Sequence, residues 1–350
     1  MTITTVLDTP LLADPADVAA DPSRHRVLTG DRPTGPLHLG HYFGTLVNRV
    51  RLQRQGVETY LVVADYQVIT DRLSPGEIAA NAREVVLDNL AAGIDPDAAT
   101  IFAHSAVPAL NQLLLPFLSL TTVAELQRNP TVKDEAQAAG IGSISGLLLT
   151  YPVHQAADIL FCHGTLVPVG DDQLPHVEQT RLIARRFNER YAGGRVVFGE
   201  PQALLSPAPR LLGVDGRKMS KSRGNAIALK ATADETARQI KRSVTDAERT
   251  VTYDPVGRPG VSSLVLLAAL CLRKSPSEVA ESVGGRGSAA LKALVTEAVN
   301  EELRPVRERR AALAAEPGLV ESLLAAGARR ATEVASRTLD EVQSALGMTY

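Results

Sequence analysis

The chain has 350 residues, a formal net charge of −2 and a pI of about 6.4, and 45% of its residues are apolar. This balance excludes a chain disordered throughout, and it excludes nucleic-acid binding through a globally basic surface, so any contact with RNA must come from local patches. The two cysteines, Cys162 and Cys271, have neither metal-ligand spacing nor the density of a disulfide scaffold, and no apolar run reaches transmembrane length.

Residues 1–23 are rich in Ala, Asp, Pro and Thr and lack a sustained hydrophobic period, so we expect them to be a mobile leader. They contain no basic region followed by an apolar core, and the sequence therefore predicts no signal peptide. Together with the cysteine usage, this favours the reducing environment of the cytoplasm.

A strand–helix–strand unit follows the leader. An apolar run over 26–29 predicts a strand, 30–35 is a loop rich in Gly and Pro, and the spacing of apolar side chains predicts a helix over 40–55. A second apolar run over 59–64 predicts a buried strand. The first turn of such a unit commonly binds phosphate, so we expect a phosphate site there.

The alternation of helix and strand continues up to residue 103. The capping signal Ser74-Pro75-Gly76-Glu77 predicts a helix that ends at Gly93, and a strand follows over 100–103. Residues from about 107 to 164 have mostly helical patterns. We therefore expect a helical insertion between strands of a parallel sheet.

The α/β pattern returns with a strand over 166–169 and a helix after Asp172, whereas only helical patterns occur from about residue 231 onward. The predicted helices of this last part include 261–272, 288–303 and 318–346, with a loop over 284–287. The expected fold class is α/β: a doubly wound parallel sheet domain over 24–230 with a helical insertion, followed by an all-α domain over 231–350.

Two motifs carry the strongest chemical signal, His38-Leu39-Gly40-His41 and Lys218-Met219-Ser220-Lys221-Ser222. Alone, the first is also compatible with a tight turn bearing two surface histidines, and the second with a solvated basic loop. Together they predict attack of a carboxylate on the α-phosphate of ATP, because that transition state needs donors where negative charge develops. His38, His41, Lys218 and Lys221 are the predicted catalytic residues.

Two further polar clusters follow predicted strand and helix positions. Gly170-Asp171-Asp172-Gln173 lies between a strand and a helix, where the carboxylates can cap the helix, bind ribose hydroxyls or an ammonium group, or do both. Tyr151, Gln155 and Asp158 share one helix face, which is either a polar edge or one wall of a binding pocket. His154, His163 and His176 share no pattern, so the sequence predicts no metal site.

The two motifs, in this order, resemble those of class I aminoacyl-tRNA synthetases. The stretch Thr29-Gly-Asp-Arg-Pro-Thr-Gly-Pro-Leu-His-Leu-Gly-His-Tyr-Phe-Gly44 narrows the resemblance to the tryptophanyl and tyrosyl branch. From about Arg26 to Tyr350 the chain is similar to tryptophanyl-tRNA synthetases, as in Gly93-Ile-Asp-Pro96 and Val167-Pro-Val-Gly-Asp-Asp-Gln173. The resemblance implies a Rossmann-like catalytic domain of the HUP type and a helical domain that binds the tRNA anticodon, with the last helix packing back on the catalytic domain.

The resemblance also implies which residues bind ATP. They are Arg32, Pro33, Thr34, Gly40, His41, Gly170, Asp171, Asp172, Leu211, Lys218, Met219, Ser220, Lys221 and Ser222. Arg32 departs from the commonest bacterial pattern, which has a neutral amide at this position, so the contacts of Arg32 itself do not carry over. Lys133 would lie near the phosphates by the same resemblance, with an exposed helix lysine as the alternative.

The implied tryptophan-binding residues are Asp158, Tyr151, Gln155, Gln173 and Gln67. A buried Asp158 would accept the indole N–H, which is the single polar group of a tryptophan side chain. The usual bacterial pattern has methionine at the position of Gln155 and histidine at that of Gln67, so the pocket wall is altered. The Tyr-x-x-x-Gln-x-x-Asp pattern also resembles the side-chain pocket of tyrosyl enzymes, which makes tyrosine the alternative substrate.

The implied function is ligation of tryptophan to tRNA(Trp), with ATP and Mg²⁺ as co-substrate, in a homodimer joined through the inserted helices and outside any membrane. Three alternatives stay open at this point: a tyrosine–tRNA ligase, a small-molecule adenylyl- or cytidylyltransferase, and a synthetase paralogue with a regulatory role. Basic clusters at Arg185-Arg186 with Arg190, at 304–310 and at Arg329-Arg330 are either solvated helix faces or, near the C-terminus, contacts to the tRNA backbone.

Overall fold

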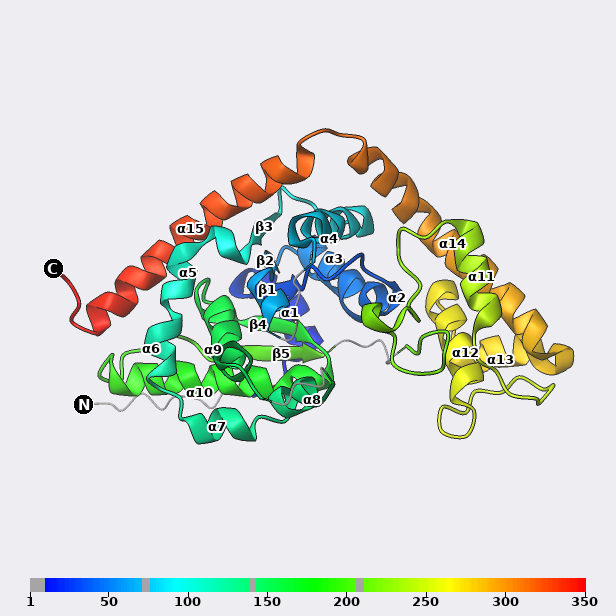
Figure 1. Ribbon diagram of the computed structural model, residues 1–350, viewed down its shortest axis with the longest axis horizontal. Helices are drawn as coiled ribbons and strands as arrows, with labels where there is room; N and C mark the ends of the chain where they lie inside the picture. Colours follow the sequence, from blue (N-terminus) through cyan, green and yellow to red (C-terminus); the bar gives the residue numbers. More distant parts are fainter. Residues whose placement is uncertain (1–9, 71–75, 139–142, 206–210) are drawn as a thin grey trace.

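A five-stranded parallel sheet forms the centre of the larger part of the molecule. The computed structural model describes residues 10–70, 76–138, 143–205 and 211–350 (Figure 1). The strand order is β3-β2-β1-β4-β5, and every pairing is parallel. The strands are β1 (Arg26–Asp31), β2 (Glu58–Val63), β3 (Ala99–Ala103), β4 (Leu166–Val169) and β5 (Gln202–Leu205). This order confirms the doubly wound fold, and its reversal between β1 and β4 marks the edge where such sheets bind ligands.

One interrupted helix follows β1. It consists of α2 (Leu39–His41), the π-helical segment Tyr42–Leu46 and α3 (Val47–Arg54), in good agreement with the helix predicted over 40–55. π-helical turns are rare inside α-helices and frequent at functional sites. After β2, helix α4 (Ile78–Ala92) ends at Gly93, whose φ of +117° favours glycine. Of the predicted capping signal, Ser74 and Pro75 lie outside the described residues.

The predicted insertion between β3 and β4 is helical. It contains α5 (Pro108–Gln112), α6 (Leu114–Leu118), α7 (Val123–Arg128), α8 (Pro130–Ala138) and α9 (Gly146–Leu160). Helix α10 (Leu174–Arg190) follows β4 and packs against α9. The lower left of Figure 1 shows α6, α7 and α10 gathered beside the sheet.

From residue 233 onward the secondary-structure elements are all helices, as predicted. They include α11 (Ala233–Arg242), α12 (Pro259–Leu272), α13 (Pro276–Val283), α14 (Gly287–Ala314) and α15 (Leu319–Ala345). Figure 1 shows α14 leaving this helical region and α15 returning over the sheet-containing part, where it packs against β3 and α5. Among the described residues, no single helix is long and apolar enough to cross a membrane; one bent pair, Pro276–Ala314 with Leu319–Ala345, passes that test together.

Three features differ from the sequence predictions. A mobile leader is expected over 1–23, but the described residues 10–23 contain α1 (Pro15–Ala20), whose Val18 is buried in a small core with Val27 and Leu204. Strand β5 has no counterpart among the predicted strands. Helix α14 continues to Ala314 through Pro305, well beyond the predicted end at residue 303.

Candidate active site

His38 and His41 form a reciprocal cap at the start of α2. The Nδ1 atom of His38 accepts the Gly40 N–H at 3.1 Å, and Nδ1 of His41 accepts the His38 N–H at 3.3 Å. Their ring centroids are 3.8 Å apart. The two histidines therefore occupy the place that Ser and Glu take in an ordinary capping box, directly beyond the carboxyl end of β1.

Both imidazoles are neutral at pH 7. Burial, with the nearby His41 and Lys221, lowers the pKa of His38 to about 3, and burial lowers the pKa of His41 to about 4, helped by Lys221 and Arg49 and opposed by Asp31. Because Nδ1 of each ring accepts a backbone N–H, the hydrogen bonds assign the single ring proton to Nε2. The pair thus offers two Nε2–H donors without carrying a charge.

The lysine motif lies against this cap. The Lys221 ammonium donates to the Gly35 carbonyl at 2.8 Å, and that of Lys218 is 3.4 Å from an Asp172 carboxylate oxygen. Met219 is buried, and its sulfur would be 3.6 Å from a Cβ at Gly40. The structure therefore brings together the two motifs, which lie far apart along the chain.

A short pairing of extended segments fixes the two motifs relative to each other. The Leu39 N–H donates to the Ile227 carbonyl at 3.0 Å, and the Leu229 N–H donates to the Leu37 carbonyl at 2.9 Å. Asn225 accepts the Ser220 N–H and donates to the Lys218 carbonyl, which shapes the lysine loop itself. Because both motifs are held by backbone hydrogen bonds, their side chains approach the same space.

The other residues predicted to bind ATP lie on three segments of the chain, of which the one after β4 contacts Lys218 through Asp172. Arg32, Pro33 and Thr34 connect β1 to α2, where the Thr34 N–H donates to the Arg32 carbonyl at 2.8 Å. Gly170, Asp171 and Asp172 follow β4, and both aspartates are exposed. Leu211 is buried in the same core as Leu37 and Met219. Ser220 adjoins the 3₁₀ turn Lys221–Arg223, and the side chain of Ser222 lies outside the described part.

A second polar cluster surrounds Asp158 on α9. Asp158 is 4% exposed, its Oδ2 accepts from the Gln67 amide at 3.4 Å, and its Oδ1 lies 3.3 Å from Nε2 of His104. Burial raises the pKa of Asp158 well above its usual range, and Asp65 adds to the shift. Within the described residues, Oδ1 of Asp158 and Oε1 of Gln67 are buried without a hydrogen bond. Unsatisfied buried acceptors of this kind suit a ligand that brings an N–H donor.

The remaining residues predicted for this pocket lie on α9 and at the start of α10. The Tyr151 hydroxyl is 3.1 Å from Nε2 of His176, and both side chains are buried. Gln155 lies one turn before Asp158 and is partly buried, as is Gln173, which precedes α10. Lys133 is exposed on α8.

Sequence reasoning missed His104, which is central to the Asp158 cluster. His104 directly follows β3, and its Nδ1 accepts from the Gln67 amide at 3.2 Å, so its proton lies on Nε2. Within the described residues this Nε2 makes no hydrogen bond, although Oδ1 of Asp158 lies 3.3 Å away, so both atoms keep a free bonding position. Burial and His154 lower the pKa of His104 to about 3. The available signal was its position at the carboxyl end of a predicted strand, the edge at which doubly wound sheets bind their ligands.

A buried ion pair behind His41 was also missed. The guanidinium of Arg49, on α3, is 2.5 Å from the Asp31 carboxylate at the end of β1, and it also donates to Thr29 and to the Asn89 side chain. Despite burial, this contact holds the pKa of Asp31 at about 2. The pair fixes the end of β1 to the helix that carries His41.

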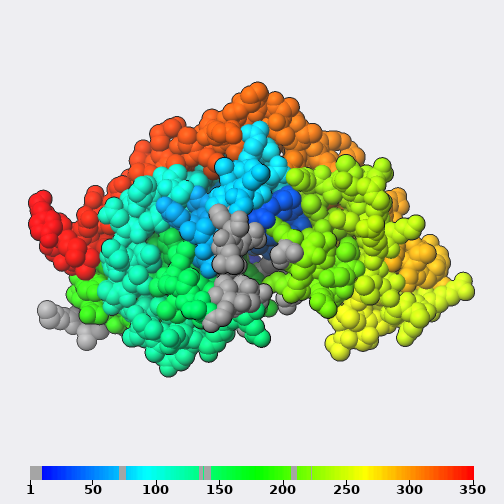
Figure 2. All heavy atoms as spheres, in the orientation of Figure 1, coloured from blue at the N-terminus to red at the C-terminus, as the bar shows by residue number. Residues whose placement is uncertain are grey.

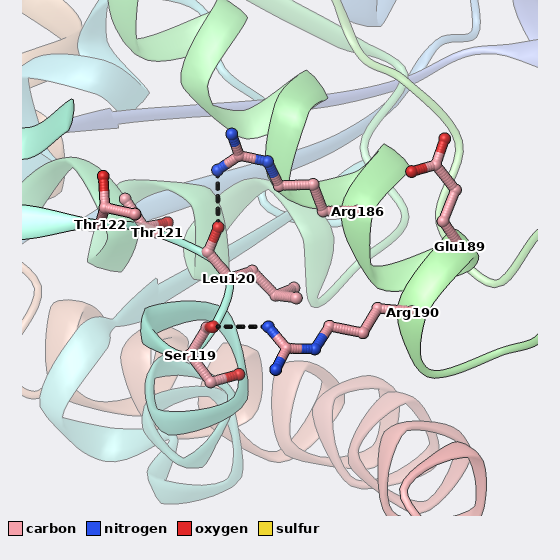
Figure 3. Close-up of a pocket in the computed structure, with 7 residues that line it drawn as sticks. All are labelled: Ser119, Leu120, Thr121, Thr122, Arg186, Glu189 and Arg190. Atoms are coloured by element: carbon pink, nitrogen blue, oxygen red, sulfur yellow. Dashed lines mark hydrogen bonds between the residues drawn. The ribbon is translucent and has the colours of Figure 1, made fainter.

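Several arginines of the predicted basic clusters have hydrogen-bond or ion-pair partners elsewhere in the molecule. Figure 3 shows a surface hollow lined by Ser119, Leu120, Thr121, Thr122, Arg186, Glu189 and Arg190, none of which belongs to either motif. Arg186 in this hollow pairs with Glu125 at 2.6 Å and donates to the Leu120 carbonyl. Arg310 pairs with Asp88 at 2.7 Å, and Arg330 donates to the Ala99 carbonyl at 3.3 Å. Arg186 and Arg310 therefore join neighbouring parts of the molecule, whereas Arg330 is exposed, as expected for a solvated helix face. Contacts of these clusters with tRNA stay a prediction.

Comparison with known proteins adds an independent line of support. A model of the tRNA synthetases class I (W and Y) matches residues 21–304. The tryptophan–tRNA ligase of Clostridium longisporum is 42% identical over 333 residues, which cover 93% of this chain and 97% of the relative. A crystal structure of tryptophanyl-tRNA synthetase from Mycoplasma pneumoniae has a TM-score of 0.80 at 26% identity, over 92% of this chain and 97% of that one. The Campylobacter jejuni enzyme complexed with ADP and tryptophan has a TM-score of 0.77 at 29% identity, over 92% and 99%.

Proposed function

The chain belongs to the class I tRNA synthetases of the tryptophan and tyrosine group, and we propose that it activates L-tryptophan with ATP and transfers it to tRNA(Trp). The observation that carries this choice of substrate is the buried Asp158, whose Oδ1 has no hydrogen bond within the described residues. An indole N–H is the donor that such an acceptor requires, and the relative from C. longisporum is named a tryptophan–tRNA ligase.

In the first step, a carboxylate oxygen of tryptophan attacks the α-phosphorus of ATP. The new P–O bond gives tryptophanyl-AMP, and the bond to the bridging oxygen breaks to release pyrophosphate with its electron pair. The Nε2–H groups of His38 and His41 donate to phosphate oxygens as their charge grows, while Lys218 and Lys221 follow the departing pyrophosphate. Mg²⁺ arrives with ATP and neutralises part of the phosphate charge.

In the second step, a hydroxyl of the terminal ribose of the tRNA attacks the carbonyl carbon of the adenylate. The ester bond to the tRNA forms as the bond between the carbonyl carbon and the AMP oxygen breaks, and the hydroxyl proton passes to the phosphate group of the released AMP. The helical region from α11 to α14 would bind the anticodon end of the same tRNA. Figure 2 shows this region, in yellow and orange, separated from the sheet-containing part by a cleft that opens at the lower edge of the view.

Tryptophan-dependent exchange of pyrophosphate into ATP tests the first step, with tyrosine in parallel. We expect exchange with tryptophan and at most a trace with tyrosine, and the reverse preference would replace the proposal by a tyrosine–tRNA ligase. Charging of tRNA(Trp) transcript tests the second step. Exchange without charging would favour the regulatory paralogue, and exchange with neither amino acid would remove the ligase assignment.

The proposal includes a homodimer in the cytoplasm. Leu115 on α6 is 74% exposed and Val123 at the start of α7 is 60% exposed, so the insertion presents apolar side chains that a second copy would cover. Cys162 and Cys271 are both buried and free, which suits a reducing compartment. Sedimentation of the wild type as a dimer and of Leu115→Glu as a monomer is the expected result; a wild-type monomer at micromolar concentration would contradict it.

A further inference from the structure

Asp88, in the middle of α4, has hydrogen bonds to two different parts of the molecule. It is fully buried, and its Oδ2 accepts the backbone N–H of Leu37 at 2.7 Å. Its Oδ1 accepts from Nε of Arg310 on α14, also at 2.7 Å. One carboxylate thus contacts the segment that leads into the histidine cap and the long helix of the helical region.

The contact at Leu37 lies directly next to the predicted catalytic residues. Leu37 precedes His38 in the chain, and its carbonyl accepts the Leu229 N–H from the segment that follows the lysine loop. Its N–H is buried and depends on Asp88 for a partner. A displacement of Asp88 would therefore be passed through one peptide unit to the ring of His38.

The contact with Arg310 makes the position of the Asp88 carboxylate depend on helix α14. The Arg310 side chain is 14% exposed, and its Nη2 also donates to Glu84 at 2.8 Å, one turn before Asp88 on α4. A separate hydrogen bond of 2.9 Å joins the Tyr42 hydroxyl, just after the histidine cap, to Glu302 of the same helix α14. Two sets of hydrogen bonds therefore connect helix α14 with the chain around the histidine cap.

We propose that Asp88 is a positioning residue for His38 and His41, and that Arg310 makes the alignment of these histidines depend on the position of α14 relative to α4. This inference rests on the proposed function, since it concerns the rate of the same activation step. It differs from a simple stabilising role because the rate of a phosphoryl-transfer step is sensitive to displacements of about 1 Å, which change it by about 10²-fold.

The test compares Asp88→Asn with Glu84→Gln in the full-length protein. An amide has one acceptor oxygen and one donor nitrogen in place of two acceptor oxygens, so the nitrogen of the asparagine would face the N–H of either Leu37 or Arg310. Glu84 is the matched control because it pairs with the same arginine through a single oxygen, which it shares with Lys230, whereas the Leu37 N–H donates to Asp88. Tryptophan-dependent exchange, thermal unfolding and tryptophan binding by fluorescence are measured for both variants.

We expect Asp88→Asn to lower kcat for exchange by about 10-fold to 100-fold with KM for ATP changed far less, while tryptophan binding is retained and Glu84→Gln keeps a kcat near that of the wild type. Equal kcat values in the two variants would overturn the positioning role. A wild type that is inactive in exchange would instead overturn the proposed function, so the two failures are distinguishable.

A second pair of variants decides the matter if Asp88→Asn does not fold. Arg310→Gln removes the charge that holds Asp88 but leaves the Leu37 hydrogen bond, and Arg310→Lys restores a cation. We expect the glutamine variant to lose kcat and the lysine variant to recover part of it. If both variants have the wild-type kcat, α14 does not control the alignment of His38.

Discussion

At the scale of single residues, the candidate site combines uncharged donors on one side of the phosphates with charged donors on the other. His38 and His41 are neutral because they are buried, whereas Lys218 and Lys221 lie on a loop fixed by Asn225. Neutral donors can remain close to each other and to a lysine without repulsion. The two lysines are therefore expected to supply most of the charge-dependent stabilisation of the transition state.

Substitution of Lys221 by alanine is expected to lower kcat for pyrophosphate exchange by about 10²-fold to 10³-fold, because the ammonium group acts where negative charge develops. Lys292→Ala is the matched control, since Lys292 also donates to a backbone carbonyl, that of Lys241, but lies in the helical region. The control should keep the wild-type rate. An unchanged rate in Lys221→Ala would remove the phosphate role from this loop.

Substitution of Asp158 by alanine is expected to abolish most tryptophan binding while ATP binding is retained. Sites built around one specific hydrogen bond reject a mismatched ligand by about 10⁴-fold or more. The chain contains no tryptophan, so fluorescence excited in the indole band reports the ligand with little background from its 7 tyrosines. Equal affinities of the wild type and Asp158→Ala for tryptophan would show that this carboxylate is not the indole acceptor.

At the scale of helices and strands, the sequence predicted elements with a strong local signal and missed those defined by packing. Strands β1 to β4 are apolar runs near Gly or Pro, and the predicted sheet followed from them. Strand β5, with the sequence Gln-Ala-Leu-Leu, contains no β-branched or aromatic residue, whereas β4 of the same length contains two valines, so the sequence of β5 has no strand signal. Its pairing with β4 depends on residues far away in the chain.

The same contrast between local sequence signals and distant packing partners applies to the residues of the candidate active site. The two motifs could be predicted because each is contiguous and its spacing is chemically specific. His104 could have been noted only by its position after a predicted strand, and neither its contact with Asp158 nor the Asp31–Arg49 pair could be predicted, because the partners come from other strands and helices. A lone histidine or a lone arginine in sequence carries no information about which carboxylate it will meet.

The close packing of α15 on β3 gives a prediction about Gly327. A Cβ at this position would overlap the Ile101 carbonyl oxygen, so Gly327→Ala must push the helix away from the strand. We expect a loss of about 1–3 kcal/mol in the free energy of unfolding, measured by urea denaturation. Gly146→Ala, with nothing within 4 Å of the added Cβ, should change it by no more than about 0.5 kcal/mol. Similar losses in both variants would contradict the close approach.

At the scale of the whole molecule, buried neutral histidines dominate the dependence of stability on pH. Burial lowers the pKa values to about 3 for His38 and His104 and to about 4 for His41, His154 and His176. Between about pH 6.5 and pH 4 the unfolded chain therefore binds protons at these positions that the folded protein does not. The contribution of these neutral histidines to stability is therefore complete above pH 6.5, the pKa of histidine in the unfolded chain. It is lost as the pH falls from about 6.5 to about 4.

The free energy of unfolding is accordingly expected to fall as the pH is lowered from about 6.5 to 5, with a limiting slope of about 1.4 kcal/mol per pH unit for each histidine that stays neutral. Asp88 and Asp158, whose pKa values are raised by burial, act in the opposite direction but are fewer. Asp31, with a pKa of about 2, titrates below the window. Urea denaturation at several pH values measures the slope, and a stability that is constant or rises toward pH 5 would contradict the assignment of neutral histidines.

The π-helical segment Tyr42–Leu46 restricts which insertions and deletions this region can accept during evolution. A π-helical turn takes up one residue more than an α-helical turn, and each residue of an α-helix turns the chain by about 100°. Loss of one residue here would rotate His41 relative to Arg49, so that either the histidine cap or the ion pair with Asp31 would break. A substitution at Gly44 is tolerated more easily, since a Cβ there would meet nothing within 4 Å. Homologues that keep both contacts are therefore free to change the residue at position 44 but not to delete a residue from this turn, whose Tyr42, Phe43 and Leu46 are buried.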